Sequence, residues 1–234
     1  MTTTRRRPAV LAALTALTVS VVVAVAGCDA AGPVGLGGGA PGIEDGGEPA
    51  DPAGDVDRPD ASYDVSVTVD EAAVRVHYSL TNDSGQPLLV VNRLPVAAGA
   101  GLGYPTDGAY VTGQDDDRVL VSQRVFAWPD TDRMDWAQAP RIGVTRLAPG
   151  ESTEATLSVA RPFTRSQPFG DYLGYGKIAL PDPAHDVVFC LGVIPSPYPL
   201  AIGMTEDDGV PTIAHGDASN EAQYLFCSDP VTLD

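Results

Sequence analysis

Apolar and polar residues alternate along much of the chain after residue 60. In the first such segment Tyr63, Val65, Val67 and Val69 are separated by polar residues. A period of two is typical of a β-strand with one buried face. This alternation and several continuous apolar runs predict strands over residues 63–69, 74–80, 88–91, 109–111, 119–125, 142–147, 153–159, 187–194 and 223–226.

Turn-forming residues separate the predicted strands. Residues 82–85 read Asn-Asp-Ser-Gly and residues 148–151 read Ala-Pro-Gly-Glu, and these residue types suit tight turns. No segment after residue 28 shows the 3.6-residue period of an amphipathic helix. The pattern therefore predicts one all-β domain over residues 61–234, an antiparallel sandwich or barrel long enough to bury a core.

Two segments combine strands and turns in a recognisable order. Residues 74–92 hold a strand, an Asn-x-Ser-Gly turn and a second strand, and residues 147–152 form a Leu-x-Pro-Gly-Glu-Ser corner. These segments resemble the immunoglobulin-like domains of bacterial lipoproteins. The resemblance implies an Ig-like β-sandwich, and it implies no particular activity. Both tryptophans precede Cys190, so the antibody-type pattern of a tryptophan between two paired cysteines is absent.

The first residues have the parts of a secretion signal. Arg5, Arg6 and Arg7 give a positive start, and residues 9–27 form an apolar run that ends on small residues. The run is long enough to span a bilayer, so a retained membrane helix is the alternative. The adjacent arginines also leave the twin-arginine export route open beside the general one.

The end of this run reads Val25-Ala26-Gly27-Cys28, and no basic stop-transfer cluster follows it. The tetrapeptide resembles the lipobox of bacterial lipoproteins. That resemblance implies that the thiol of Cys28 receives a diacylglycerol before cleavage and that the new amino terminus is often acylated, which gives stable membrane anchoring. We therefore expect residues 1–27 to be removed as a signal peptide. The mature protein is then expected on the extracytoplasmic face of the cell membrane.

Residues 28–60 differ in composition from the rest of the chain. They are rich in Gly, Pro, Ala and acidic residues, and they contain no aromatic residue. Such a segment buries too little apolar surface to order itself. The sequence thus predicts a disordered acidic tether over residues 28–60, between the signal at 1–27 and the β-domain at 61–234.

The chain is strongly acidic. Its formal net charge is −17, and removal of the three arginines in residues 1–27 makes the mature part still more negative. Nucleic-acid binding needs a basic surface, so we expect no nucleic-acid partner. Anionic lipid would also repel the domain, so we expect the membrane link to be the lipid on Cys28.

Assigning Cys28 to lipid leaves Cys190 and Cys227 as a pair. An even pair in an oxidising compartment predicts a disulfide. Two free buried thiols are the alternative. The spacing excludes a CxxC redox or zinc site.

No catalytic constellation is visible in the sequence. There is no Gly-x-Ser-x-Gly elbow, and Lys177 is the only lysine. The three histidines, His77, His185 and His215, have no spacing that suggests a catalytic triad or a zinc motif. We expect all three at the surface, and we assign no catalytic residue, metal ligand or cofactor.

Acidic clusters give calcium the strongest case among the metals. Residues 115–117 and 206–208 are acidic, and so are Asp130, Asp132 and Asp135. Carboxylates are the ligands that calcium prefers, but none of these clusters has the spacing of an EF-hand loop. We interpret them as solvated turns, with a calcium site as the alternative.

Three long segments, 126–141, 161–186 and 195–221, have no predicted regular structure. Loops of this length often bind a ligand or a partner. The first contains Trp128 and Trp136 beside Asp130 and Asp132, and tryptophan is favoured at interface anchors. These four residues are the candidate contact residues, and the alternative is that the tryptophans cap the open end of the sandwich.

These observations favour a non-enzymatic lipoprotein that binds a protein or a polysaccharide of the cell envelope. One alternative is a hydrolase of envelope polysaccharide with Asp or Glu catalysts, which requires a groove with two carboxyl groups roughly 5 to 9.5 Å apart. The other is a lipoprotein that binds calcium or a small ligand.

Overall fold

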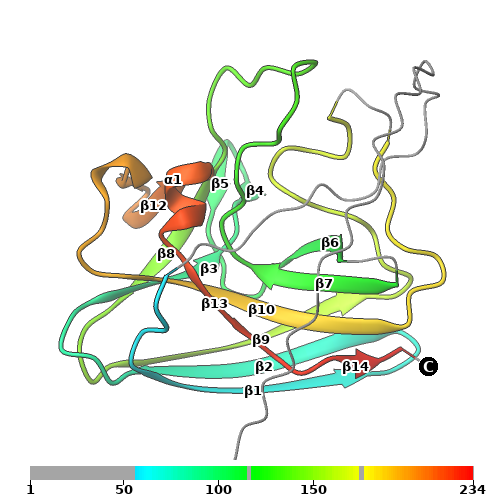
Figure 1. Cartoon of the computed structure of the whole chain (residues 1–234), viewed down its shortest axis with the longest axis horizontal. Helices are drawn as coiled ribbons and strands as arrows, with labels where there is room; N and C mark the ends of the chain where they lie inside the picture. Colours follow the sequence, from blue (N-terminus) through cyan, green and yellow to red (C-terminus); the bar gives the residue numbers. More distant parts are fainter. Residues whose placement is uncertain (1–55, 115–116, 174–176, 234) are drawn as a thin grey trace, which may run out of the picture. The chain divides into compact units, whose positions relative to one another are not determined.

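The computed structural model describes residues 56–114, 117–173 and 177–233. The expected signal, Cys28 and the tether as far as residue 55 lie outside these residues. In the described part the chain is built almost wholly from β-strands (Figure 1), which confirms the predicted all-β class. No helix in these ranges is long and apolar enough to cross a membrane.

The strands form two main sheets. Sheet A has the order β1-β2-β9 and sheet B has the order β11-β12-β8-β3-β10-β7-β6, with β13 and β14 on the second edge of β10. A separate hairpin is formed by β4 and β5. The elements are β1 (Ala61–Val69), β2 (Ala73–Asn82), β3 (Leu88–Arg93), β4 (Val96–Ala98), β5 (Gly101–Gly103), β6 (Tyr110–Gln114), β7 (Arg118–Gln123), β8 (Arg141–Leu147), β9 (Ser152–Ala160), β10 (Asp186–Pro195), the 3-10 helix η1 (Leu200–Ile202), β11 (Thr205–Asp207), β12 (Val210–Ala214), α1 (Asp217–Glu221), β13 (Tyr224–Cys227) and β14 (Val231–Thr232).

Sheet B is mixed, whereas the sequence predicts an antiparallel sandwich or barrel. β10 runs parallel to β7, with Asp186 opposite Arg118 and Leu191 opposite Gln123. Parallel neighbours need a long connection, and here residues 124–185 pass through β8 and β9 before the chain returns as β10. Alternation along a strand reports which face is buried and gives no information on the direction of its neighbour.

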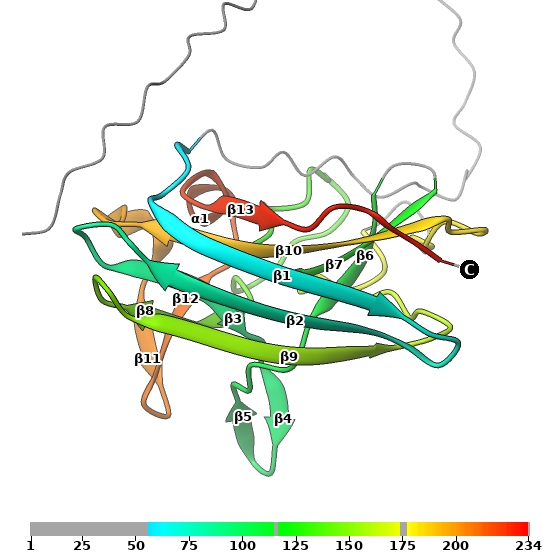
Figure 2. The same ribbon diagram turned by 90° about the horizontal axis from the view of Figure 1, so that it is seen from below.

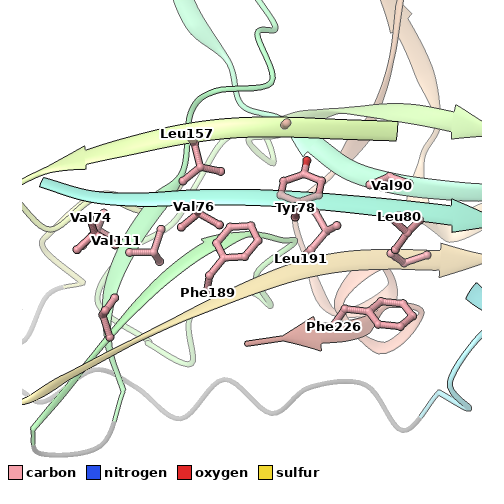
Figure 3. Close-up of a cluster of buried hydrophobic side chains, with 14 of the residues drawn as sticks. Val74, Val76, Tyr78, Leu80, Val90, Val111, Leu157, Phe189, Leu191 and Phe226 are labelled. Atoms are coloured by element: carbon pink, nitrogen blue, oxygen red, sulfur yellow. The ribbon is translucent and has the colours of Figure 1, made fainter. Parts of the chain in front are cut away.

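The first core fills the space between the sheets (Figure 3). The Tyr78 ring stacks on Phe189 with ring centroids 5.6 Å apart. Burial of each large apolar side chain stabilises the fold by about 1.5–3 kcal/mol, so this contact surface holds the two sheets together. Its fully buried members include Val74, Val76, Tyr78 and Leu80 from β2, and Phe189, Leu191 and Val193 from β10.

A second core covers the opposite face of sheet B. Along β3, Leu88 and Val90 face the first core, whereas Leu89 and Val91 face the second. The three long segments without predicted regular structure supply much of the second core, including Phe126, Phe169, Leu173, Ile178 and Ile202. The apolar residues of these segments therefore form a packed third layer on sheet B.

A buried glutamine forms hydrogen bonds at the place where β7 ends and β3 begins along the same edge of β10. Along one edge of β10, β7 pairs as far as Leu191 and β3 continues from Gly192. Gln123 is fully buried at this junction. Its amide nitrogen donates to the carbonyls of Thr106 at 2.8 Å and Gly108 at 2.7 Å, and its oxygen accepts from the Tyr78 hydroxyl at 2.8 Å.

We predict that Gln123→Glu destabilises the domain strongly. The change keeps the side-chain shape but places a buried carboxylate against backbone carbonyls, which should lower the free energy of unfolding by about 3 kcal/mol or more. Gln86→Glu is the matched control, because residue 86 is exposed and a surface change of this kind costs about 0.5 kcal/mol or less. Urea unfolding of both variants measures the difference, and equal stabilities would contradict the role given to Gln123.

Candidate functional site

The aromatic residues of the long segments converge. Trp128 lies 5.9 Å from Trp136 and 5.2 Å from Phe169, measured between ring centroids, and Trp136 lies 5.3 Å from Phe169. Phe169 is buried and belongs to the second core, and Trp136 packs against that core. Trp128 keeps 37% of its surface exposed. The tryptophans therefore cover a hydrophobic layer on sheet B.

His215 lies beneath this aromatic cluster and is 1% exposed. Its Nδ1 accepts a hydrogen bond from the backbone N–H of Phe126 at 3.1 Å, and its Nε2 lies 3.1 Å from the Tyr110 hydroxyl. A neutral imidazole with Nδ1 as acceptor carries its proton on Nε2, so Nε2 donates to Tyr110. Burial lowers the pKa of His215 to about 3, and the nearby charge of Arg124 acts in the same direction.

The expectation that His215 is a surface residue is wrong. It follows β12 directly, and the apolar residues Ile213 and Ala214 before it are the signal in the sequence that points to burial. The other two histidines, His77 and His185, are exposed as expected.

Gly216 explains why Trp128 lies where it does. Its φ of 142° is a conformation that other residues rarely adopt, and a Cβ on Gly216 would lie 3.0 Å from Nε1 of Trp128. The backbone N–H of Gly216 donates to the Phe126 carbonyl, and the Trp128 N–H donates to Asp217. These contacts fix Trp128 on the backbone beneath it, which supports the interpretation of the tryptophans as a cap.

The acidic clusters do not converge into a metal site. Asp130 and Asp132 are exposed beside the tryptophans, and Asp135 and residues 206–208 are exposed as well. Among the described residues no group of three or more His, Cys, Asp or Glu side chains is placed to hold a metal ion. Asp115 and Asp116 lie outside the described residues.

Cys190 and Cys227 form a disulfide, the pairing that the sequence predicts. They face each other across the ladder between β10 and β13. The bond therefore ties β13 to β10. It also holds one wall of the groove described next, because Cys227 is among the residues that line that groove.

A groove of about 490 Å³ runs along the sandwich edge where β1 faces β13 and β14. In Figure 2, β13 and the C-terminal segment run alongside β1. Arg58 is also at this edge, with its guanidinium 5.1 Å from the centroid of the Phe226 ring. The lining residues come from both sheets: Arg58, Tyr63, Asp64, Val65 and Val67 on one side, and Tyr224, Leu225, Phe226, Cys227, Ser228, Asp229 and Val231 on the other.

The outer edge of β1 carries no partner strand among the described residues. Opposite residues of an antiparallel pair alternate between hydrogen-bonded and non-hydrogen-bonded positions. Two backbone bonds flank the β1–β2 ladder, from Asp83 to Asp60 and from Asp70 to Ala73, so the even-numbered residues of β1 bond β2. The backbone N–H and C=O groups of Tyr63, Val65 and Val67 therefore face the open edge.

The same three residues turn their side chains toward the first core, yet all three are only half-buried. On the adjacent strand, the residues of this face, Val76 and Tyr78, are completely buried. The hydroxyl of Tyr63 has no hydrogen-bond partner among the described residues, and burial raises its pKa. The core is thus incompletely covered along β1.

The groove is a candidate binding feature that the sequence did not reveal. Alternation in residues 63–69 predicts β1 but does not show that β1 lies at an edge. No protein-family model, curated protein or solved structure matches this chain. Its function has to be inferred from this geometry and from the amino-terminal sequence.

We predict that His215 makes stability depend on pH. Its folded pKa of about 3 lies below the ordinary 6.5, so the unfolded chain binds the proton first. Stability from the neutral ring is complete above pH 6.5 and falls as the pH drops toward 3, by at most about 1.4 kcal/mol per pH unit. His215→Asn keeps an acceptor for Phe126 but loses this dependence, and at pH 7 it should cost about 1–3 kcal/mol.

Denaturant unfolding at several pH values between 3 and 7 measures this effect as a difference between variants. His185→Asn is the control for loss of a histidine, because His185 is exposed, and it should leave the slope unchanged. A slope that is the same in His215→Asn and in the parent would contradict the buried neutral ring.

Proposed function

We propose that this protein is a lipid-anchored, non-enzymatic binding module of the cell envelope. In this proposal Cys28 holds it on the extracytoplasmic face of the membrane, and the groove between β1 and β13–β14 receives a component of the envelope. The observation that carries the binding role is the groove itself, where incompletely covered core residues coincide with a strand edge that no other described strand pairs. Concave sites of a few hundred Å³ commonly hold ligands, and this groove combines apolar side chains such as Val65 and Phe226 with the charged residues Arg58, Asp64 and Asp229.

The amino-terminal sequence supports the anchor. The tetrapeptide Val25-Ala26-Gly27-Cys28 follows a positively charged start and an apolar run. The disulfide between Cys190 and Cys227 is consistent with an oxidising compartment outside the cytoplasm.

The packing of the tryptophans favours the groove over the aromatic cluster as the binding site. Trp136 and Phe169 are engaged with the second core, and Trp128 is held against Gly216. Truncation of these side chains is expected to damage the fold of the long segments as well as any contact surface. Trp128, Trp136, Asp130 and Asp132 are therefore second candidates for contact residues.

A polysaccharide hydrolase is the rival function, because two acids, Asp64 and Asp229, line the groove. Both are exposed. Asp64 is one of the even-numbered residues of β1, and the side chains of these residues face away from the first core. Two carboxyl groups that hydrolyse a glycosidic bond have to flank that bond from opposite sides. This placement favours binding over hydrolysis.

We predict that Cys28 carries the lipid. Cells that express the full chain and are fed an alkyne fatty acid should yield labelled protein that lacks residues 1–27, whereas Cys28→Ala should not be labelled. The double variant Cys190→Ala/Cys227→Ala is the control, because it keeps Cys28 and should retain the label. An unlabelled species that keeps residues 1–27 would refute the anchor.

We also predict that the groove contacts an envelope component in cells. A photo-crosslinking amino acid at position 67 points toward the groove, whereas one at position 68 points to the opposite face of sheet A. Irradiation of intact cells should give a defined adduct from position 67 and none from position 68. Equal adducts from both positions, or none from either, would count against a binding role for the groove.

A further inference from the structure

We propose that β1 accepts an extended segment of a partner polypeptide as an additional strand of sheet A. The segment carries apolar side chains at alternate positions and basic residues at its ends. This inference rests on the proposed binding function and names its partner class. Strand addition to an open sheet edge uses backbone hydrogen bonds for affinity and alternate side chains for selectivity.

The backbone of β1 presents what an added strand requires. Tyr63, Val65 and Val67 each offer one N–H and one C=O at the outer edge. Alternate residues of a strand are spaced roughly 6.6 Å apart, so these groups form a regular row. A small molecule would form hydrogen bonds with only part of this row of N–H and C=O groups, whereas an extended polypeptide can form hydrogen bonds with all of them.

The side chains favour the same occupant. In an antiparallel pair, residues directly opposite each other place their side chains on the same face of the sheet. Residues opposite Tyr63, Val65 and Val67 would therefore point into the groove, toward Phe226 and Val231 on its other wall. Apolar residues at these alternate positions would cover the half-buried edge of the first core.

β1 also lacks the features that protect most edge strands. Natural edges are commonly blocked by proline, by lysine, by bulges or by short length. β1 is 9 residues long, its register with β2 is unbroken, and Asp64 is its one charged residue. Such an edge is a template for pairing.

Charge selects among the possible partners. Two acids, Asp64 and Asp229, line the groove with one cation, Arg58, and the whole chain has a net charge of −17. A second copy of the chain would add a like charge, and residues 28–60 of the same chain are themselves acidic. A segment with Lys or Arg at its ends is attracted instead, and this attraction raises its rate of association.

The test uses the full-length chain in detergent and a synthetic probe, acetyl-Lys-Val-Thr-Val-Thr-Val-Lys-amide. We expect fluorescence anisotropy to show saturable binding. N-methylation of the three valines removes the N–H groups that face β1 and should weaken binding at least tenfold. N-methylation of the two threonines leaves those groups intact and should retain binding, so equal affinity of the two methylated peptides would overturn the proposal.

A matched pair of protein variants tests the same edge. Val65→Pro removes one N–H that faces the outer edge and breaks no hydrogen bond to β2. An edge strand tolerates proline at such a position. Val65→Thr keeps that N–H and nearly the same shape. We expect Val65→Pro to weaken probe binding at least tenfold with a thermal midpoint close to that of Val65→Thr, which should bind like the parent. Equal binding by both variants would overturn the proposal.

Hydrogen exchange shows whether the edge is open before the probe binds. The amides of residues 63, 65 and 67 should exchange fast in the free protein and slowly with the probe, whereas those of 64 and 66 should be protected throughout. Protection of 63, 65 and 67 without the probe would overturn the proposal. If that protection disappears on dilution, a second copy of the chain covers the edge. If the protection persists on dilution, a segment of the same chain covers it. The peptide tests could fail while the photo-crosslinker at position 67 still gives an adduct in cells. In that outcome strand addition is wrong, whereas the groove still binds an envelope component of another chemical class.

Discussion

The fold depends on the pairing of β10 along both of its edges. One edge is shared by β7 and β3, and the other is covered by β13 and β14. Every residue of β10 between its two ends is buried. This strand therefore separates the first core from the second, and the disulfide from Cys190 to Cys227 attaches the C-terminal segment to it. Because β13 and β14 end sheet B on the side where β1 ends sheet A, the position of β10 also determines where the groove opens.

Alternation in the sequence predicts the strands that have one polar face. Residues 63–69 and 74–80 are part of β1 and β2, and residues 153–159 are part of β9. These three strands form sheet A, which faces the first core on one side only. Sheet B is buried on both faces near β3 and β10, so its strands are continuous apolar runs, and periodicity gives neither their partners nor their direction.

Several polar residues of the interior could not be predicted from periodicity. Gln123 and His215 are buried because unpaired backbone groups at chain junctions need hydrogen-bond partners, and those junctions exist only in the folded chain. The second core escaped prediction for a related reason. Its residues lie in segments rich in Pro and Gly, and the packing of Phe169 beneath the tryptophans joins segments that are distant in the sequence. The position of β1 at an edge is likewise a property of the complete sheet.

Strand addition requires that β1 keep an open, pairing-competent edge in the folded protein. The most direct test is NMR of the isotope-labelled full chain with the unlabelled valine-threonine probe, in which cross-strand contacts and hydrogen-bond couplings report pairing. We expect couplings between probe carbonyls and the amides of Tyr63, Val65 and Val67, with the couplings between β1 and β2 unchanged. Couplings from the amides of Asp64 or Ser66 to the probe, or none from the odd-numbered residues, would contradict strand addition.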